Sequence, residues 1–114
     1  MRPIPRRLLI HSAILYPAGD RDIWGKASGG DKVQMTYVRI DSTSKIVRDK
    51  NSAEIQLAAV LFYDCQSSRP REMSFEQDQQ VVFSEQRYRI QTVEPMYDEH
   101  GLHHYEIGLV RYAG

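Results

Sequence analysis

The sequence has few of the features that mark several common protein classes. Its 114 residues include one cysteine, which rules out an internal disulfide and a CxxC pair for zinc or redox chemistry. No apolar run approaches the ~20 residues of a transmembrane helix. The 15 basic and 15 acidic residues cancel, so there is no overall attraction to nucleic acid or to an acidic membrane. These absences argue against a disulfide scaffold, a membrane protein and a broadly basic nucleic-acid coat.

Motifs that carry catalysis are also missing. The sequence has no GxSxG, P-loop, HExxH or Rossmann glycine pattern, and Cys65 has no histidine near it in sequence. The run His100-x-x-His103-His104 resembles a metal cluster, but in a strand His103 and His104 point to opposite faces. We therefore predict no catalytic residue, no bound metal and no cofactor. A metal-dependent enzyme built on Asp98, His100 and His103 remains an alternative.

What the sequence does contain is typical of one globular domain over residues 1–114. Hydrophobic residues make up 41% of the chain and charged residues 26%, which is too apolar for a disordered protein. Arg2, Arg6 and Arg7 precede an apolar stretch, as in a signal peptide. That stretch is short, is interrupted by polar residues and lacks a cleavage site. We therefore expect the chain to be mature and intracellular.

The zero net charge hides a division along the chain. Residues 1–71 hold 12 basic and 7 acidic residues, a balance of +5, whereas residues 72–106 hold 2 basic and 8 acidic residues, a balance of −6. Such charge runs are usually solvated surface. The alternative is a molecule with one positive and one negative face, suited to head-to-tail association with copies of itself.

Short runs of β-branched and aromatic residues predict a mainly β protein, a small antiparallel barrel of about six strands. The predicted strands are 7–16, 33–41, 53–64, 80–83, 87–94 and 104–112. In the second strand Val33, Met35 and Tyr37 share one face, after which Val38 and Ile40 switch phase, and this predicts a β-bulge near Tyr37-Val38. Proline has no N–H for the ladder, so we expect Pro95 to end the fifth strand.

Two long loops interrupt this pattern. Residues 17–32 hold four glycines around Trp24, and residues 42–52 are mostly polar. Loops of this length in a small domain are usually functional or disordered. Trp24 either anchors a protein interface or plugs one end of the barrel. Val60 and Phe62 lie on the second face of the third predicted strand, which is either covered within the domain or meets a partner.

A nucleic-acid site is a second alternative. Tyr37, Arg39, Arg87 and Arg89 could form a stacking groove on a small barrel that binds single-stranded nucleic acid. Strand alternation turns Arg87 and Arg89 away from Tyr88, and the surrounding segment is acidic. Both features count against this reading.

Several short stretches, spread in order over most of the chain, resemble a known family. They are Leu8–His11, Trp24–Gly25, Val38–Asp41, Leu61–Asp64, Val81–Phe83, Tyr88–Ile90, Val93–Pro95 and Leu102–Val110. In order and spacing the chain is similar to the minor capsid, or head–tail joining, proteins of tailed bacteriophages, especially the head-closure (stopper) connectors. One departure is the turn Ser84-Glu85-Gln86, which lacks the glycine expected there.

The resemblance implies a structural subunit without catalysis. Such proteins form a ring beneath the portal and adaptor, close the DNA-filled head and dock the tail, and a long loop between early strands projects into the channel. By position, that loop would be centred here on Lys45, Ile46, Val47, Arg48, Asp49 and Lys50. Trp24, Val60 and Phe62 would lie at contacts between subunits.

The implied partners are copies of this chain, the portal and adaptor, and the tail proteins. Contact with packaged DNA would be indirect, and no membrane is involved. The implied location is the head–tail junction of the virion, after synthesis in the cytoplasm of the bacterial host.

Overall fold

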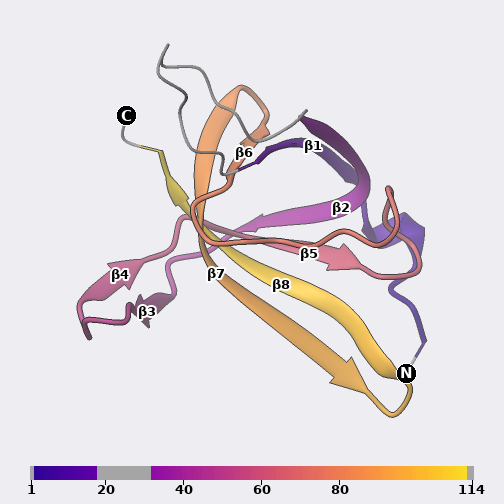
Figure 1. Cartoon of the computed structure of the whole chain (residues 1–114). Helices are drawn as coiled ribbons and strands as arrows, with labels where there is room; N and C mark the ends of the chain where they lie inside the picture. Colours follow the sequence, from indigo (N-terminus) through magenta and orange to yellow (C-terminus); the bar gives the residue numbers. More distant parts are fainter. Residues whose placement is uncertain (1, 18–31, 113–114) are drawn as a thin grey trace.

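A computed structural model describes residues 2–17 and 32–112 (Figure 1). Within these residues a short 3₁₀ helix, η1 (Arg6–Leu8), precedes the strands. The strands are β1 (His11–Tyr16), β2 (Val33–Ser42), β3 (Ile46–Arg48), β4 (Glu54–Gln56), β5 (Ala59–Asp64), β6 (Gln80–Phe83), β7 (Gln86–Asp98) and β8 (Gly101–Arg111). Most of the predicted loop 17–32, including Trp24, lies outside the described residues.

Six of these strands form a closed barrel in the order β1-β2-β5-β8-β7-β6, and every neighbouring pair is antiparallel. The predicted fold class, a mainly β protein with an antiparallel barrel of about six strands, is confirmed. β3 and β4 pair only with each other in the described chain. Figure 1 shows this hairpin standing away from the barrel, while the β7–β8 hairpin extends beyond it on another side.

Alternate residues of the barrel strands fill its interior. Leu61 of β5 and Ile107 of β8 are cross-strand partners, and both are fully buried. Each buried aliphatic side chain of this size contributes about 1.5–3 kcal/mol. The buried cluster comprises Ala13, Leu15, Met35, Val38, Ile40, Ala59, Leu61, Tyr63, Phe75, Val81, Ile90, Ile107 and Leu109. The core therefore lies inside the barrel, and the β3–β4 hairpin contributes nothing to it.

The predicted β-bulge in β2 is present. His11 pairs with Val38 and Ala13 with Met35, so two residues of β2 lie opposite one residue of β1. Tyr37 takes up the extra length with a φ of 55° and an exposed side chain. Met35 and Val38 consequently both face the core, which is the switch of phase seen in the sequence.

The predicted strand 53–64 is interrupted. Its ends form β4 and β5, and the chain leaves the barrel between them to make the hairpin. Leu57, expected to continue the inward face, instead covers Gly108 on the outside of β8, where its Cδ1 would lie 2.9 Å from a Cβ added to that glycine. The predicted loop 42–52 contains β3.

The expectation that Pro95 ends its strand is wrong. β7 continues to Asp98, and Pro95 lies opposite Tyr105 of β8. β6 pairs with β7 only as far as Arg89. Beyond that point one edge of β7 has no partner strand in the described chain, and a residue without an N–H is tolerated at such an edge.

Candidate functional site

Residues Lys45 to Lys50 form the first half of a projecting hairpin. In it Ile46 pairs with Gln56, Val47 with Ile55 and Arg48 with Glu54. The carboxylate of Asp49 closes the turn, since its Oδ1 accepts the N–H groups of Asn51 at 2.8 Å and Ala53 at 2.9 Å. Asx turns of this kind fix a tight loop without any tertiary contact.

Backbone hydrogen bonds close the hairpin at its base, and the Ala58 N–H that follows it donates to the Leu109 carbonyl of β8 at 2.8 Å. The Thr43 N–H donates to the Ala58 carbonyl at 3.1 Å, and the Leu57 N–H donates to the Lys45 carbonyl at 2.8 Å. From Ile46 to Gln56 no residue is buried, and Ile46 exposes 58% of its surface. An isolated two-stranded hairpin is marginally stable in water. This segment therefore depends on its base, or on a partner, to hold its position.

Val60 and Phe62 face outward from β5, between the inward-facing Leu61 and Tyr63. Both are half-buried. Val60 has Gly108 of β8 as its cross-strand partner, and Phe62 has Glu106. Neither side chain belongs to the core, so an apolar strip lies on the outer wall of the barrel.

The base of the hairpin and this strip share one surface. A pocket of about 20 Å³ at their junction is lined by Lys45, Leu57, Val60, Thr92, Glu94, Glu106 and Gly108. The structure thus brings one predicted channel-loop residue, Lys45, next to one predicted interface residue, Val60. The sequence did not assign Glu94 and Glu106 to this surface, because they become neighbours only through the pairing of β7 with β8.

The four residues considered for nucleic-acid binding are divided between two sides of the barrel. Tyr37 and Arg39 belong to β2, and Arg87 and Arg89 to β7, three places away in the strand order. Arg39 and Arg89 each form an ion pair with a nearby aspartate, at 3.0 Å and 2.8 Å. Arg87 stacks over the ring of Tyr16 at 5.5 Å. These residues therefore do not form one groove.

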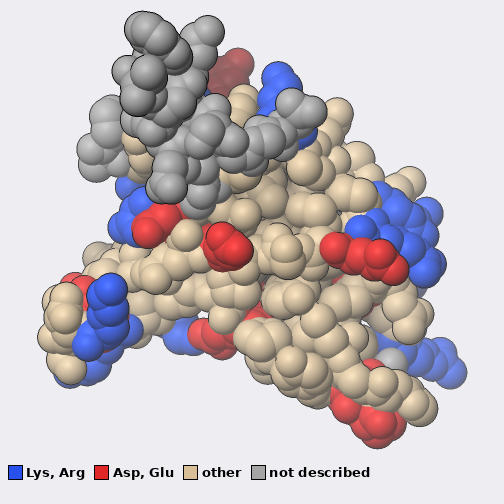
Figure 2. Space-filling model, in the orientation of Figure 1, with Lys and Arg blue, Asp and Glu red and all other residues tan. Residues whose placement is uncertain are grey.

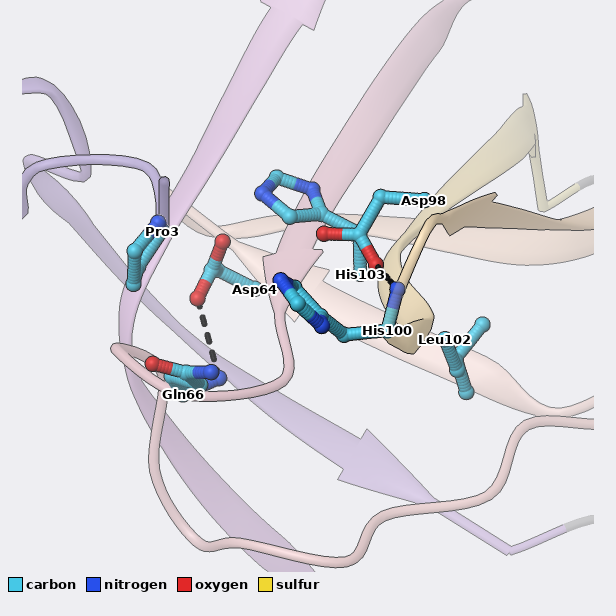
Figure 3. Close-up of a pocket in the computed structure, with 7 residues that line it drawn as sticks. All are labelled: Pro3, Asp64, Gln66, Asp98, His100, Leu102 and His103. Carbon is cyan, nitrogen blue, oxygen red and sulfur yellow. Dashed lines mark hydrogen bonds between the residues drawn. The ribbon is translucent and has the colours of Figure 1, made fainter. Parts of the chain in front are cut away.

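The histidine cluster lies at the end of the barrel near the N-terminal residues. Asp64, Asp98, His100 and His103 line a pocket of about 140 Å³ (Figure 3). The expectation that His103 and His104 point to opposite faces is wrong, because their Nδ1 atoms lie 2.7 Å apart. The pairing of β7 with β8 shifts at this point and leaves an extra residue on β8, which breaks the alternation.

The acidic groups of this pocket are held by backbone N–H groups. Asp64 is fully buried and accepts from Ile4 at 2.8 Å, Gln66 at 2.9 Å and Ser67 at 2.8 Å. The N–H of His100 donates to Asp98 at 2.8 Å and lowers the pKa of that carboxyl. Over residues 2–17 and 32–112, no three histidine, cysteine, aspartate or glutamate side chains are arranged to hold a metal ion.

Cys65 follows Asp64 at the end of β5. Burial raises the pKa of its thiol, and the neighbouring Asp64 carboxylate raises it further. Both effects disfavour the thiolate, which is the nucleophilic form. This environment suits an inert packing residue better than a reactive one.

Comparison with known sequences identifies the family to which the chain belongs. A family described as minor capsid protein matches residues 5–109, from the segment before η1 to near the end of β8. The chain belongs to this family. As a minor capsid protein it is a structural component of the phage virion. Comparisons with curated proteins and with solved structures give no match.

Two further facts describe this minor capsid protein. In the part of the chain that the structure describes, no helix is long and apolar enough to cross a bilayer. Figure 2 shows basic atoms on the projecting β3–β4 hairpin and acidic atoms at the tip of the β7–β8 hairpin, with both signs interspersed between them. On the face drawn, the charge division of the sequence is not a division into two halves.

Proposed function

We propose that this minor capsid protein is a subunit of the phage head–tail connector. In this proposal it forms a ring below the portal and adaptor, closes the DNA-filled head and provides the surface on which the tail docks. The observation that supports the proposal is the exposed β3–β4 hairpin, which stands off the barrel. By its position in the sequence, this segment would correspond to the channel loop of the stopper proteins that the chain resembles.

The make-up of the hairpin suits a place in a channel that holds DNA. Lys45, Arg48 and Lys50 outnumber Asp49 and Glu54, so the segment has a net charge of +1. Basic side chains attract phosphates. A hairpin without a core of its own gains support when several copies lie side by side around an axis. In the ring, Lys45 to Lys50 would therefore line the channel and help to retain DNA.

The outer wall of β5 supplies a surface for contact between subunits. Closed rings need two different patches on each chain, because their contacts are head-to-tail. Val60 and Phe62 are half-buried apolar groups beside the carboxylates of Glu94 and Glu106. An apolar centre with a charged rim is typical of protein interfaces. Trp24 stays a predicted member of this contact.

The test removes the hairpin and keeps the barrel. The hydrogen bond from the Leu57 N–H to the Lys45 carbonyl has the pattern that closes a two-residue turn. Replacing residues 46–56 by Asn-Gly should therefore leave the melting temperature nearly unchanged. Particles assembled with this variant should lose packaged DNA, measured as nuclease-resistant DNA per particle.

A matched control keeps the hairpin and removes two of its charges, by Arg48→Gln with Lys50→Gln. It should retain more DNA than the variant without the hairpin. Unchanged retention after removal of the hairpin would contradict the stopper role. Electron microscopy with the cognate portal and adaptor tests the ring itself, and a chain that stays an unattached monomer contradicts the connector role.

A further inference from the structure

Exposed apolar side chains gather at two places on the molecule. Seven large hydrophobic side chains of the described residues are exposed, and five of them fall into two groups. One group is Leu8, Ile10 and Tyr37, and the other is Met96 and Tyr97. Single apolar side chains are common on protein surfaces, whereas exposed apolar groups that lie together mark contact sites. The surroundings of each group therefore decide what it fits.

The first group lies around a groove beside the start of β1. This groove has a volume of about 500 Å³ and is lined by Leu9, Ile10, His11, Ser12, Thr36 and Tyr37. Ile10 exposes 65% of its surface, and the β-bulge of β2 leaves the ring of Tyr37 exposed as well. We call this hollow the β1–β2 groove. Its exposed apolar groups are unlike the polar side chains that usually line a solvated surface.

The surroundings of the β1–β2 groove are basic. Residues 3–12 contain Arg6 and Arg7 and no acidic residue. The guanidinium of Arg6 lies 4.0 Å from the centre of the Tyr37 ring. Arg39 Nη1 donates to the Leu8 carbonyl at 3.3 Å, although the charge of Arg39 is already paired with Asp41. A partner that fits this groove therefore combines apolar side chains with negative charge.

The second group lies on the β7–β8 hairpin, where this hairpin extends beyond the barrel (Figure 1). Tyr97 exposes 68% of its surface and has Leu102 as its cross-strand partner, and Pro95 is paired with Tyr105 on the same face. Residues 94–106 hold four acidic residues and neither lysine nor arginine. We call this segment the acidic finger. It combines the apolar side chains and the negative charge that fit the β1–β2 groove.

We propose that the acidic finger of one copy of this chain docks in the β1–β2 groove of a second copy. In this contact Tyr97 packs against Ile10 and Tyr37. The carboxylates of the finger lie beside Arg6 and Arg7. Two different surfaces meet, so the contact is head-to-tail and extends to a ring or a row of subunits. The inference does not rest on the proposed connector role, because both surfaces belong to this chain.

Charge favours this arrangement over a symmetric contact. Two acidic fingers that faced each other would bring their carboxylates together, and two grooves that faced each other would bring their arginines together. Like charges placed opposite each other across an interface repel. Docking the finger in the groove instead places opposite charges together, and it covers both groups of exposed apolar side chains in one contact. Figure 2 shows the separation that this needs, with basic atoms over η1 and acidic atoms at the tip of the β7–β8 hairpin.

Cross-linking of the intact chain tests which surfaces meet. In a Cys65→Ser background, Ile10→Cys and Tyr97→Cys each place one thiol on one of the two surfaces. Mixed at millimolar concentration with a short thiol-specific cross-linker, these two variants should give at least tenfold more linked dimer than either variant alone. Ile46→Cys, which is as exposed but lies on the β3–β4 hairpin, is the matched control partner for Tyr97→Cys. Equal linking of like positions, or no excess over this control, would overturn the proposal.

Sedimentation velocity measures the strength of the same contact. Tyr97→Ser removes the apolar centre of the finger and should weaken self-association about tenfold. Arg7→Glu places a negative charge beside the groove and should also weaken self-association, with a smaller effect at high salt because salt screens the repulsion. Lys50→Glu makes the same change of charge on the β3–β4 hairpin and should have no effect. Unchanged association in Tyr97→Ser, or equal effects of Arg7→Glu and Lys50→Glu, would also overturn the proposal.

Discussion

Leu61 in β5 is fully buried inside the barrel, whereas Ile46 in the β3–β4 hairpin exposes 58% of its surface. The barrel is stabilised by the burial of apolar side chains, and the hairpin by hydrogen bonds within itself. Changes in the hairpin therefore should not unfold the barrel. In this minor capsid protein, the segment proposed to act in the channel is separate from the residues that keep the chain folded.

The largest expected effect is a loss of stability of the barrel. Ile107 is fully buried on β8, and Ile107→Ala should lower the free energy of unfolding by about 2–5 kcal/mol, because it leaves a cavity. Urea denaturation measures the change. As the matched control, Ile46→Ala should change it by less than about 0.5 kcal/mol. Equal effects at the two positions would contradict the division between barrel and hairpin.

An intermediate effect is expected where the hairpin joins the barrel. A Cβ added to Gly108 would lie 2.3 Å from Oγ1 of Thr92 and 2.9 Å from Cδ1 of Leu57. Gly108→Ala should therefore cost about 1–3 kcal/mol through overpacking. Thermal denaturation gives the size of the loss. Adding Thr92→Ala removes the nearest atom and should restore part of the stability, and a double variant no better than Gly108→Ala would refute this cause.

The smallest global effect is expected in the turn of the hairpin. Asp49→Ala removes the acceptor for the N–H groups of Asn51 and Ala53. The barrel should keep its free energy of unfolding within about 0.5 kcal/mol. Amide exchange within residues 46–56 should rise about fivefold, the equivalent of roughly 1 kcal/mol. A loss of barrel stability would show that the two regions are coupled.

Features that depend on one strand could be predicted from the sequence. The alternation that places Ile107 and Leu109 inside was visible, and so was the shift of phase that creates the bulge at Tyr37. Both leave a mark in the local order of apolar residues. The β3–β4 hairpin is harder to recognise in the sequence, because Val47 and Ile55 are its only cross-strand pair of apolar residues.

Features that depend on pairing between strands could not be predicted. Pro95 is tolerated inside β7 because β6 ends before it, and the chain order does not reveal where a neighbouring strand stops. His103 and His104 meet because β8 has an extra residue opposite β7. Glu94 and Glu106 become neighbours in the same way. The candidate site on the outer wall and the contact between His103 and His104 both arise from these pairings.

The seam between β1 and β6 bears on how the chain folds. It is short, with Ile14, Leu15 and Tyr16 paired to Val82, Val81 and Gln80, and its two sides lie far apart in sequence. The β7–β8 hairpin, by contrast, joins neighbouring residues and can form early. Closing a long loop costs conformational entropy before the new contacts stabilise the closed form. The β1–β6 seam should therefore form last and limit the folding rate. Barrels with such non-local pairing fold in the millisecond-to-second range. Until the seam closes, the facing edges of β1 and β6 are unpaired, and unpaired strand edges are the places where a strand of another newly made copy can add.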